Sequence, residues 1–469
     1  MRIEFPLFAP RHEGAVVGGH LGRETAGGQT QLTVTAAIYG EAFLPRRREM
    51  KIGPVMATRG EHLVRADRRF ATGAGVLGRL AAPGFRQVLD QIHERLRHGG
   101  IDARLPDGSR RRLGFHRPGP TAMVRLNSWM ALVRLATSGS VGWYKAWAAG
   151  EWSSPDPVPL FELFMLNGRA LGEVGRAKGV MRRINRLAHL LRDNGPGQAR
   201  ENIAAHYDLG NDFYAEWLDP SMTYSSARFE PDDTLEEGQR RKVNRMLHRL
   251  QIKPGDRLLE IGCGWGTLAI EAARRGAQVV GLTLSAEQKS WAEKNVADSQ
   301  LSDRIEIRLQ DYREVGEQFD AVASVEMVEA VGQRWWPAYL DSIARNLKPG
   351  GRAALQFISI RHELFESYSR NADFIQAYIF PGGMLIDEPG FEALAKERGL
   401  GWDDREGFGL DYAETLRQWR ERYDAAVAEG RLQGFSDQFH DLWRYYLMYC
   451  EGGFRGGGID VAQVTMVKA

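Results

Sequence analysis

The chain has 469 residues, of which 43% are hydrophobic, 26% are charged and 10% are aromatic. This length suggests two or three domains with ample core, and the composition excludes a disordered, collagen-like or disulfide-stapled chain. Two cysteines cannot build a disulfide framework, so a reducing compartment is expected. No apolar run approaches the roughly 18 residues of a spanning helix, and the N-terminus does not resemble a signal peptide. We therefore expect a cytoplasmic protein that is soluble or peripherally attached to a membrane.

The net charge of +2 hides an asymmetry between the two halves of the chain. Residues 1–200 hold 31 Lys/Arg and 16 Asp/Glu, a balance of +15, whereas residues 201–469 hold 31 and 44, a balance of −13. A basic half favours an anionic partner, which could be a membrane surface or a nucleic acid. Alternatively, the two halves dock on one another through their opposite charges.

The first part of the chain gives few signals. Residues 1–80 match no pattern that we can assign. Apolar residues at helical spacing predict a helix over 84–98, and Asp107-Gly108 predicts a hairpin turn within 105–115. The apolar and aromatic stretch 121–149 is typical of core.

A basic amphipathic helix is predicted over 174–192, where apolar residues form one face and six Lys/Arg surround them. Such a helix can lie on an anionic membrane, but it can equally be a solvated linker helix. The turn-forming cluster NGPGQAR at 194–200 follows, at the point where the charge balance changes sign. We therefore expect an N-terminal, largely helical, basic domain over 1–195 and a second domain over 196–469.

The second half alternates between predicted strands and helices. This rhythm indicates an α/β fold with a doubly wound, Rossmann-like sheet, whose ligand lies at the carboxyl ends of the strands. The predicted strands are RLLEI, AQVVGLTLS, RIEIRLQD, FDAVASVEM and RAALQFISI.

A glycine-rich turn follows the first of these strands, in the order Glu260-x-Gly262-x-Gly264-x-Gly266. The glycines allow a ligand to approach the backbone closely, above the N-terminus of the next helix. Asp311 ends the third strand, where its carboxylate could accept a hydrogen bond from an adenine amino group. Together these features resemble class I S-adenosylmethionine-dependent methyltransferases. The competing dehydrogenase interpretation lacks the G-x-G-x-x-G spacing and an acidic residue at the end of the second strand.

Longer motifs narrow the resemblance to one family. The chain is similar to the cyclopropane-fatty-acyl-phospholipid synthases, relatives of the mycolic acid methyltransferases, over 200–469, and more weakly back to about residue 85. The motifs are HYDLGNDFYAEWLDPSMTYSSARF, LEIGCGWGTLAIEAA, GLTLSAEQ, LQDYRE, SVEMVEAVG, YIFPGG, GFGLDYAETLRQW and YYLMYCEGGFR.

The resemblance implies that the enzyme acts on a double bond in an acyl chain of an unsaturated membrane phospholipid. The alkene attacks the sulfonium methyl of S-adenosylmethionine, and proton loss from the new methyl closes a cyclopropane ring. The basic first half would then dock on the anionic membrane surface, and nucleic acid is no longer expected as a partner. A homodimer is conceivable, and no metal site is expected, because no histidine shows metal-ligand spacing.

The resemblance also assigns cofactor contacts residue by residue. The positions that match are Tyr224 and Ser225, the turn residues Glu260, Gly262, Gly264 and Gly266, the ribose-side pair Thr283 and Gln288, and the adenine-side residues Asp311, Tyr312 and Val325.

The family's base is a bicarbonate ion, which is held by a Cys, a Glu, a His, a Tyr and a backbone amide. Glu329, Tyr412 and the amide of Ile358 match three of these groups. However, Ser226 stands where the Cys is expected and Gln356 where the His is expected. These two side chains could still hold bicarbonate through hydrogen bonds, or Glu329 or Tyr412 could handle the proton directly.

These departures affect the expected product. Ring closure is the first expectation. Proton loss from a chain carbon would instead give C-methylation without a ring, leaving a methyl- or methylene-branched chain. Two further alternatives are methylation of a small soluble substrate and a lipid-binding protein that keeps a relic methyltransferase fold.

Overall fold

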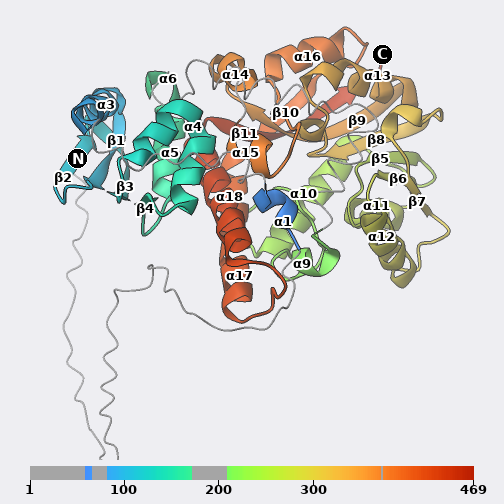
Figure 1. Cartoon of the computed structure of the whole chain (residues 1–469). Helices are drawn as coiled ribbons and strands as arrows, with labels where there is room; N and C mark the ends of the chain where they lie inside the picture. Colours follow the sequence, from blue (N-terminus) through green and yellow to red (C-terminus); the bar gives the residue numbers. More distant parts are fainter. Residues whose placement is uncertain (1–58, 66–81, 172–208, 371–372) are drawn as a thin grey trace, which may run out of the picture. The chain divides into compact units, whose positions relative to one another are not determined.

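The computed structural model describes residues 59–65, 82–171, 209–370 and 373–469 (Figure 1), all within one compact unit, Ile52–Ala469. The helix expected over 174–192, the boundary expected at 194–200 and most of the first 80 residues lie outside these ranges. Within the described ranges, no helix is long and apolar enough to cross a membrane.

A four-stranded sheet in the order β2-β1-β3-β4 forms the N-terminal region. The predicted turn at Asp107-Gly108 joins β1 and β2 as an antiparallel hairpin, whereas β3 runs parallel to β1. Helix α3 (Ala82–Arg95) confirms most of the helix predicted over 84–98 but ends three residues earlier, since His98 already belongs to β1. The stretch 121–149 divides between the end of β3 and helix α4. The remaining bounds are β1 His98–Arg104, β2 Arg110–Gly114, β3 Arg117–Leu126, β4 Trp152–Ser153, α1 Glu61–Arg65, α4 Met130–Ala148, α5 Val158–Leu166 and α6 Gly168–Leu171.

The second sheet has seven strands in the order β10-β11-β9-β8-β5-β6-β7, as the alternating sequence predicts for its central part. Strands β5 to β9 are parallel, and β11 and β10 add an antiparallel edge. The chain runs outward from β5 to β7 and then returns to β8 on the other side of β5. A crevice for ligand therefore opens at the carboxyl ends of β5 and β8. The bounds are β5 Arg257–Ile261, β6 Gln278–Thr283, β7 Ile305–Leu309, β8 Phe319–Val325, β9 Leu347–Ile360, β10 Asp403–Gly407 and β11 Ile459–Val467.

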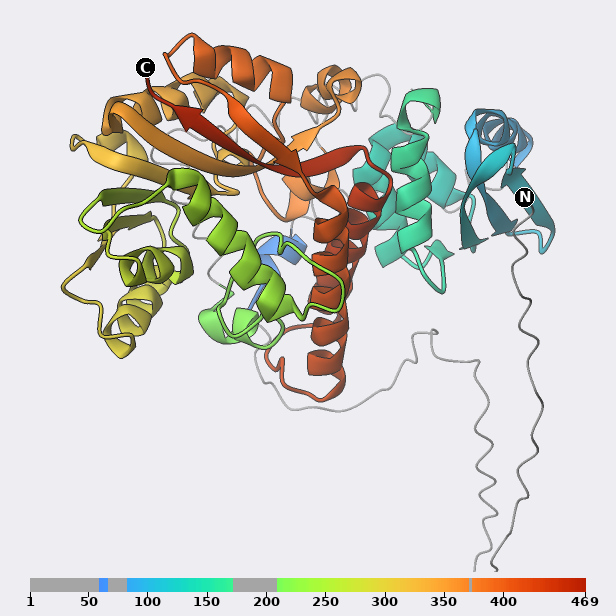
Figure 2. The same cartoon turned by 180° about the vertical axis from the view of Figure 1, so that it is seen from behind.

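Helices cover both faces of this sheet. Apolar residues of α10, α11 and α12 pack on one face, and those of α13 and α16 pack on the other (Figure 2). The helices are α9 Asn211–Ala215, α10 Leu235–Leu250, α11 Thr267–Arg274, α12 Ala286–Asp298, α13 Trp336–Asn346, α14 His362–Ser369, α15 Phe374–Tyr378, α16 Glu388–Lys396, α17 Gly409–Ala428 and α18 Asp437–Arg455, with the short 3-10 turns η2 Tyr312–Glu314, η3 Val328–Ala330 and η4 Gln333–Trp335.

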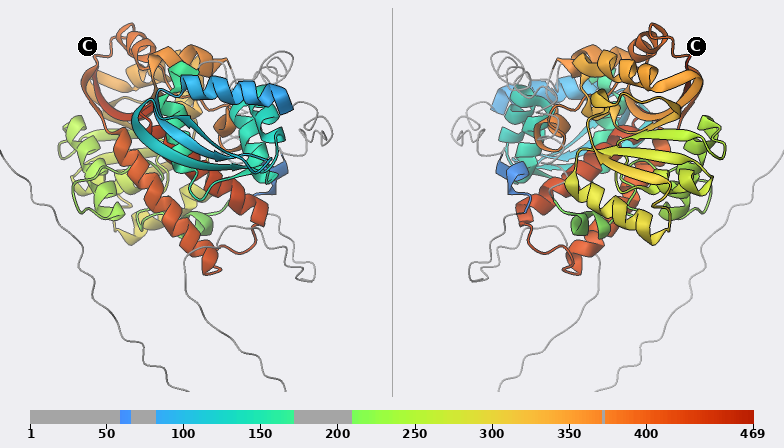
Figure 3. Two further views of the ribbon diagram at one scale, coloured as in Figure 1. Left: turned by 90° about the vertical axis from the view of Figure 1, so that its left-hand side faces the viewer. Right: turned by 90° about the vertical axis from the view of Figure 1, so that its right-hand side faces the viewer.

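The N-terminal helices α4 and α5 pack directly on the long helix α18 (Figure 3). The ring of Tyr144 on α4 contacts those of Tyr378 and Tyr445 at centroid distances of 4.7 and 5.0 Å. Phe161 on α5 contacts Tyr445 at 5.2 Å. One hydrophobic cluster therefore runs from the small sheet into α17 and α18. This contact brings N-terminal side chains to the site.

Candidate active site

The glycine turn between β5 and α11 is shaped for a ligand. Gly262, Gly264 and Gly266 have φ angles of 82°, 51° and 92°, which favour glycine. The amide of Gly262 donates to the carbonyl of Leu282 on β6 at 3.0 Å, which fixes the turn against the sheet. A Cβ atom built on Gly264 would meet no atom within 4 Å. The backbone is therefore open on this side.

Glu260 is the last residue but one of β5 and precedes Gly262 of the turn by two positions. Its side chain is buried, and its Oε2 atom has no hydrogen-bond partner among the described residues. Burial raises the pKa of Glu260 to about 8, although the amide of Ala269 and the ammonium of Lys242 oppose the rise. A buried, unpartnered carboxyl oxygen beside an open glycine turn suits a cationic hydrogen-bond donor. These residues fit the amino-acid part of S-adenosylmethionine.

Three further groups of predicted cofactor residues line the same cavity as the turn. The Thr283 hydroxyl donates to Gln288 Oε1 at 2.8 Å at the end of β6. The Asp311 carboxylate accepts hydrogen bonds from the Arg313 guanidinium, at 2.9 and 2.7 Å, and from the Arg313 amide at 2.9 Å. Burial raises the pKa of the neighbouring Tyr312 to about 12, so its hydroxyl stays protonated. Val325 ends β8 and also lines the cavity.

Tyr224 and Ser225 lie on the opposite wall, in the segment before α10. The hydroxyls of Tyr224 and Tyr446 are hydrogen-bonded at 2.8 Å, and the buried ammonium of Lys242 donates to Ser225 Oγ at 2.5 Å. Burial lowers the pKa of Lys242 to about 8, although Glu326, Asp219 and Glu260 favour its charged form. Sequence reasoning missed Lys242 because a lysine within an amphipathic helix gives no signal of burial.

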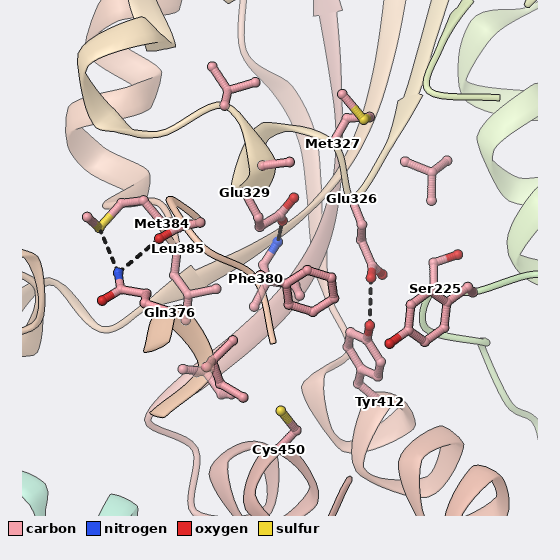
Figure 4. A pocket seen from close by; sticks show the side chains of 18 of the residues that line it. Ser225, Glu326, Met327, Glu329, Gln376, Phe380, Met384, Leu385, Tyr412 and Cys450 are labelled. Carbon is pink, nitrogen blue, oxygen red and sulfur yellow. Dashed lines mark hydrogen bonds between the residues drawn. The ribbon is translucent and has the colours of Figure 1, made fainter. Parts of the chain in front are cut away.

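A carboxylate that sequence reasoning also missed, Glu326, lies at the centre of the expected base site (Figure 4). The Tyr412 hydroxyl donates to its Oε2 at 2.7 Å. Its Oε1 accepts from Gln356 Nε2 at 2.8 Å and from the amide of Ser226 at 2.9 Å. Glu326 directly follows β8, and an acidic residue at the carboxyl end of a buried strand was the available sequence signal.

Glu329 lies beside Glu326 on η3 and also lines the cavity. Its Oε1 accepts from the amide of Ile358, while its Oε2 has no hydrogen-bond partner in the described ranges. Burial and the nearby charge of Glu326 raise the pKa of Glu329 to about 8. Glu329 is therefore largely protonated at neutral pH.

The structure brings most, but not all, of the predicted site residues to the cavity surface. Ser226, Gln356 and Gly266 lie behind it: Ser226 and Gln356 are 0% and 1% exposed. Ser226 Oγ donates to the carbonyl of Ala227 at 2.8 Å, so the hydroxyl points away from the base site. The predicted residues that line the cavity are Tyr224, Ser225, Glu260, Gly262, Gly264, Thr283, Gln288, Asp311, Tyr312, Val325, Glu329, Ile358 and Tyr412.

The cavity also reaches the N-terminal helices, where apolar and aromatic side chains line it together with the polar residues Ser140, Asp373 and Gln376. Its volume is about 590 Å³, and its far wall includes Leu135, Trp143, Phe161, Phe164 and Leu364. Four of these five residues belong to α4 and α5, so the N-terminal region builds part of the site.

Cys450 also lines the cavity, and burial raises the pKa of its thiol well above the usual range. The thiol therefore stays protonated, as expected of a packing residue rather than a nucleophile. No group of three or more His, Cys, Asp or Glu in the described parts of the chain is arranged to hold a metal ion.

Comparison with known proteins places this site in a family. Residues 196–464 match the family described as mycolic acid cyclopropane synthetase. The tuberculostearic acid methyltransferase of Mycobacterium tuberculosis is 39% identical over 383 residues, which cover 79% of this chain and 85% of that protein. The cyclopropane-fatty-acyl-phospholipid synthase of Escherichia coli K12 is 40% identical over 267 residues, which cover 56% and 66%, respectively.

Solved structures agree with this placement. The mycolic acid cyclopropane synthase CmaA1 complexed with S-adenosylhomocysteine superposes with a TM-score of 0.55 at 33% identity, over 57% of this chain and 98% of that one. The Rossmann-like fold and the cofactor expected from the sequence are thereby confirmed. The chain belongs to the mycolic acid cyclopropane synthetase family of S-adenosylmethionine-dependent methyltransferases, which transfer a methyl or methylene group to lipid acyl chains.

Proposed function

We propose that this enzyme methylates a carbon–carbon double bond in an acyl chain of an unsaturated membrane phospholipid. The main support is the single cavity that joins the open glycine turn to an apolar wall from α4 and α5. A small polar substrate would gain nothing from that wall, whereas an acyl chain would be removed from water along it.

Bound S-adenosylmethionine supplies a sulfonium methyl that an alkene can attack. The protein must then tolerate a positive charge on the acyl chain, because the second alkene carbon becomes cationic. The rings of Phe380, Tyr412 and Tyr446 line the cavity near the two glutamates, and aromatic faces attract cations. Because a carbocation is strongly acidic, a carboxylate suffices as its base.

The exposed face of the small sheet supports docking on an anionic membrane. Arg110, Arg104 and Arg125 are aligned in one row across β2, β1 and β3, and all three are exposed. In the adjacent row, the apolar side chain of Met123 is 56% exposed. A row of arginines beside an exposed apolar residue fits the headgroup region of an anionic bilayer.

Vesicle sedimentation tests this docking. We expect binding to vesicles of phosphatidylglycerol, weaker binding to phosphatidylcholine, and weaker binding as salt rises. A triple Ser variant of the sheet row should bind more weakly than a charge-matched triple Ser variant on α10 and at the C-terminal end of α11. Equal binding by the two variants would contradict the assignment of this face. The sheet-row variant replaces Arg104, Arg110 and Arg125, and the control variant replaces Arg240, Arg274 and Arg275.

For the product, we propose a methyl-branched chain, with the cyclopropane ring as the second candidate. The sequence puts the ring first, and the name of the Escherichia coli relative favours it. However, Ser226 and Gln356 depart from the ring-forming set. In addition, the Mycobacterium tuberculosis relative, whose match covers 79% of this chain and so includes part of the N-terminal region, is named a methyltransferase. We therefore place the branched product first.

Mass spectrometry of the lipid product tests both proposals. Purified enzyme is incubated with oleoyl-phosphatidylglycerol vesicles and S-adenosylmethionine that carries a CD3 methyl group. Ring closure removes one deuterium from the transferred methyl and leaves no double bond. A methyl-branched product that loses a chain proton retains all three deuteriums and a double bond, and a methylene-branched product retains two deuteriums and a double bond. A lipid without added label would refute the proposed function and favour a small soluble substrate.

A further inference from the structure

The base site of this enzyme does not fit the bicarbonate ion that the family resemblance implies. Such an ion would need the donors around it to be free. Here the Tyr412 hydroxyl, the Gln356 amide and the Ser226 backbone all donate to Glu326, and the Ile358 amide donates to Glu329. The expected donor set is therefore already occupied by two carboxyl groups of the protein.

We propose that the Glu326 carboxylate is the base of the reaction and replaces the bicarbonate ion of the family. This inference rests on the proposed function. It follows from the position of Glu326, which lies in the cavity wall between the cofactor turn and the apolar end, bound to Tyr412 and Gln356.

The surroundings of the two carboxyl groups favour ionisation of Glu326 over ionisation of Glu329. Burial raises the pKa of Glu326, whereas the Tyr412 hydroxyl, the Lys242 ammonium, the Ser226 amide and the Gln356 amide lower it. Glu329 has one backbone donor and the pKa of about 8 described above. When two adjacent carboxyl groups accept different numbers of hydrogen bonds, the one with more donors is ionised and can act as a base, and the other stays neutral. Glu326 is the base in this arrangement.

The backbone holds Glu326 in an unusual conformation. Its φ angle is +51°, which a side chain other than glycine seldom adopts, and its amide donates to the Gln356 carbonyl at 2.7 Å. Strain of this kind persists where the surrounding structure enforces it, and it is concentrated at functional sites.

A chain of buried amides also fixes the donor that faces Glu326. Arg249 Nε donates to Gln463 Oε1 at 3.2 Å, and Gln463 Nε2 donates to Gln356 Oε1 at 3.0 Å. Since a guanidinium can only donate, the orientation of both amides is determined, and the Gln356 NH2 group must face Glu326. Gln356 and Gln463 are thus positioning residues.

The reaction balances with this base. The alkene electron pair forms a carbon–carbon bond to the methyl group, the carbon–sulfur bond breaks, and S-adenosylhomocysteine leaves as a neutral thioether. Glu326 then takes one proton from the cation. If a chain carbon next to the cation loses the proton, its C–H electron pair becomes a new double bond beside the methyl branch. If the new methyl loses it, the pair closes the ring.

The test compares enzyme variants with and without bicarbonate. In CO2-depleted buffer, we expect the wild-type enzyme to keep full activity and Glu326→Gln to lose at least 100-fold in kcat, because a positioned base contributes about 10²–10⁴-fold. The affinity for S-adenosylhomocysteine, measured by calorimetry, should change less than threefold. Glu236→Gln, at an exposed position on α10, is the matched control and should behave as the wild type.

A glycine variant tests the replacement directly. Glu326→Gly relieves the positive φ angle and frees the donors of Tyr412 and Gln356, so added bicarbonate should restore activity in a concentration-dependent manner. In ¹³C NMR, labelled bicarbonate should show no specific binding to the wild-type enzyme.

Three results would overturn the proposal. They are a wild-type activity that falls on CO2 depletion and returns with bicarbonate, a Glu326→Gln variant within tenfold of wild type, and specific bicarbonate binding by the wild-type enzyme. If the wild-type enzyme methylates no lipid at all, the proposed function fails instead, and the binding experiment still decides between Glu326 and bicarbonate.

Discussion

The Tyr412→Phe substitution removes one hydrogen bond from Glu326 and little else. The hydroxyl donates to Oε2 at 2.7 Å, whereas the ring packs against Phe454 at a centroid distance of 4.5 Å and would keep that contact as phenylalanine. A hydrogen bond to a charged group contributes about 1.5–3 kcal/mol. If this energy stabilises the ionised base, its loss corresponds to a decrease in kcat of about 10- to 160-fold at neutral pH.

The pH dependence has a definite sign. The base is active when ionised, so activity falls as the pH drops through its pKa. The Tyr412 hydroxyl lowers the pKa of Glu326, so its removal should move the acidic limb of the pH–kcat profile to higher pH. The other titratable groups that face Glu326 are Lys242 on α10 and Glu329 on η3, and both remain in the variant.

The assay is the initial rate of methyl transfer to oleoyl-phosphatidylglycerol vesicles between about pH 5 and pH 9, the range in which raised carboxyl pKa values are expected. Tyr445→Phe is the control, because the buried Tyr445 hydroxyl has no hydrogen-bond partner among the described residues. It should leave the profile in place. An unchanged acidic limb in Tyr412→Phe, or an equal movement in the control, would refute the assignment of Glu326 as an ionised base.

Three further substitutions test other parts of the site. Gly264→Ala places a methyl group in open space at a positive φ angle, so it should cost about 1–2 kcal/mol of stability but weaken S-adenosylhomocysteine binding at least tenfold by calorimetry. Leu364→Trp narrows the cavity at its wall near α4 and α5, so the turnover of oleoyl lipid should fall at least tenfold while the affinity for S-adenosylhomocysteine is retained. An unchanged rate would contradict the proposal that the acyl chain lies along this wall. Gln463→Leu removes the hydrogen-bond partner of Gln356 Oε1 and of Arg249 Nε. We expect the free energy of unfolding, measured with denaturant, to fall by about 1–3 kcal/mol for each polar group left unpaired, and kcat to fall as well. Unchanged stability would contradict the chain of amides from Arg249 to Gln356.

The central sheet could be predicted from the sequence because its signals are local. Each parallel strand is a short apolar run that ends at glycine or polar residues, and a strand buried on both faces needs no other pattern. The glycine turn with Glu260 could be predicted for the same reason. The antiparallel edge was harder to foresee: β10 (Asp403–Gly407) consists almost entirely of charged residues and pairs with a strand more than fifty positions later.

The place of Glu326 in the proposed base site could not be predicted, because its hydrogen-bond partners come from distant segments. Glu326 is bound by residues 30, 86 and 100 positions away, and each contact depends on how β9, α17 and the segment before α10 meet. Matching positions to the family predicted a base site of Glu329, Tyr412, Ile358, Ser226 and Gln356 but gave Glu326 no role. The burial of Lys242 and the contribution of α5 to the cavity likewise follow from tertiary packing rather than from spacing.

The shared hydrophobic cluster between the N-terminal helices and α18 has a consequence for how the enzyme unfolds. Because Tyr144 and Phe161 complete the packing of Tyr445, neither part can lose its structure without exposing the core of the other. We therefore expect residues 82–171 and 209–469 to melt in one cooperative transition. The small N-terminal sheet and the cavity would then lose their structure together under heat, detergent or a destabilising mutation, so a change that weakens one would weaken the other.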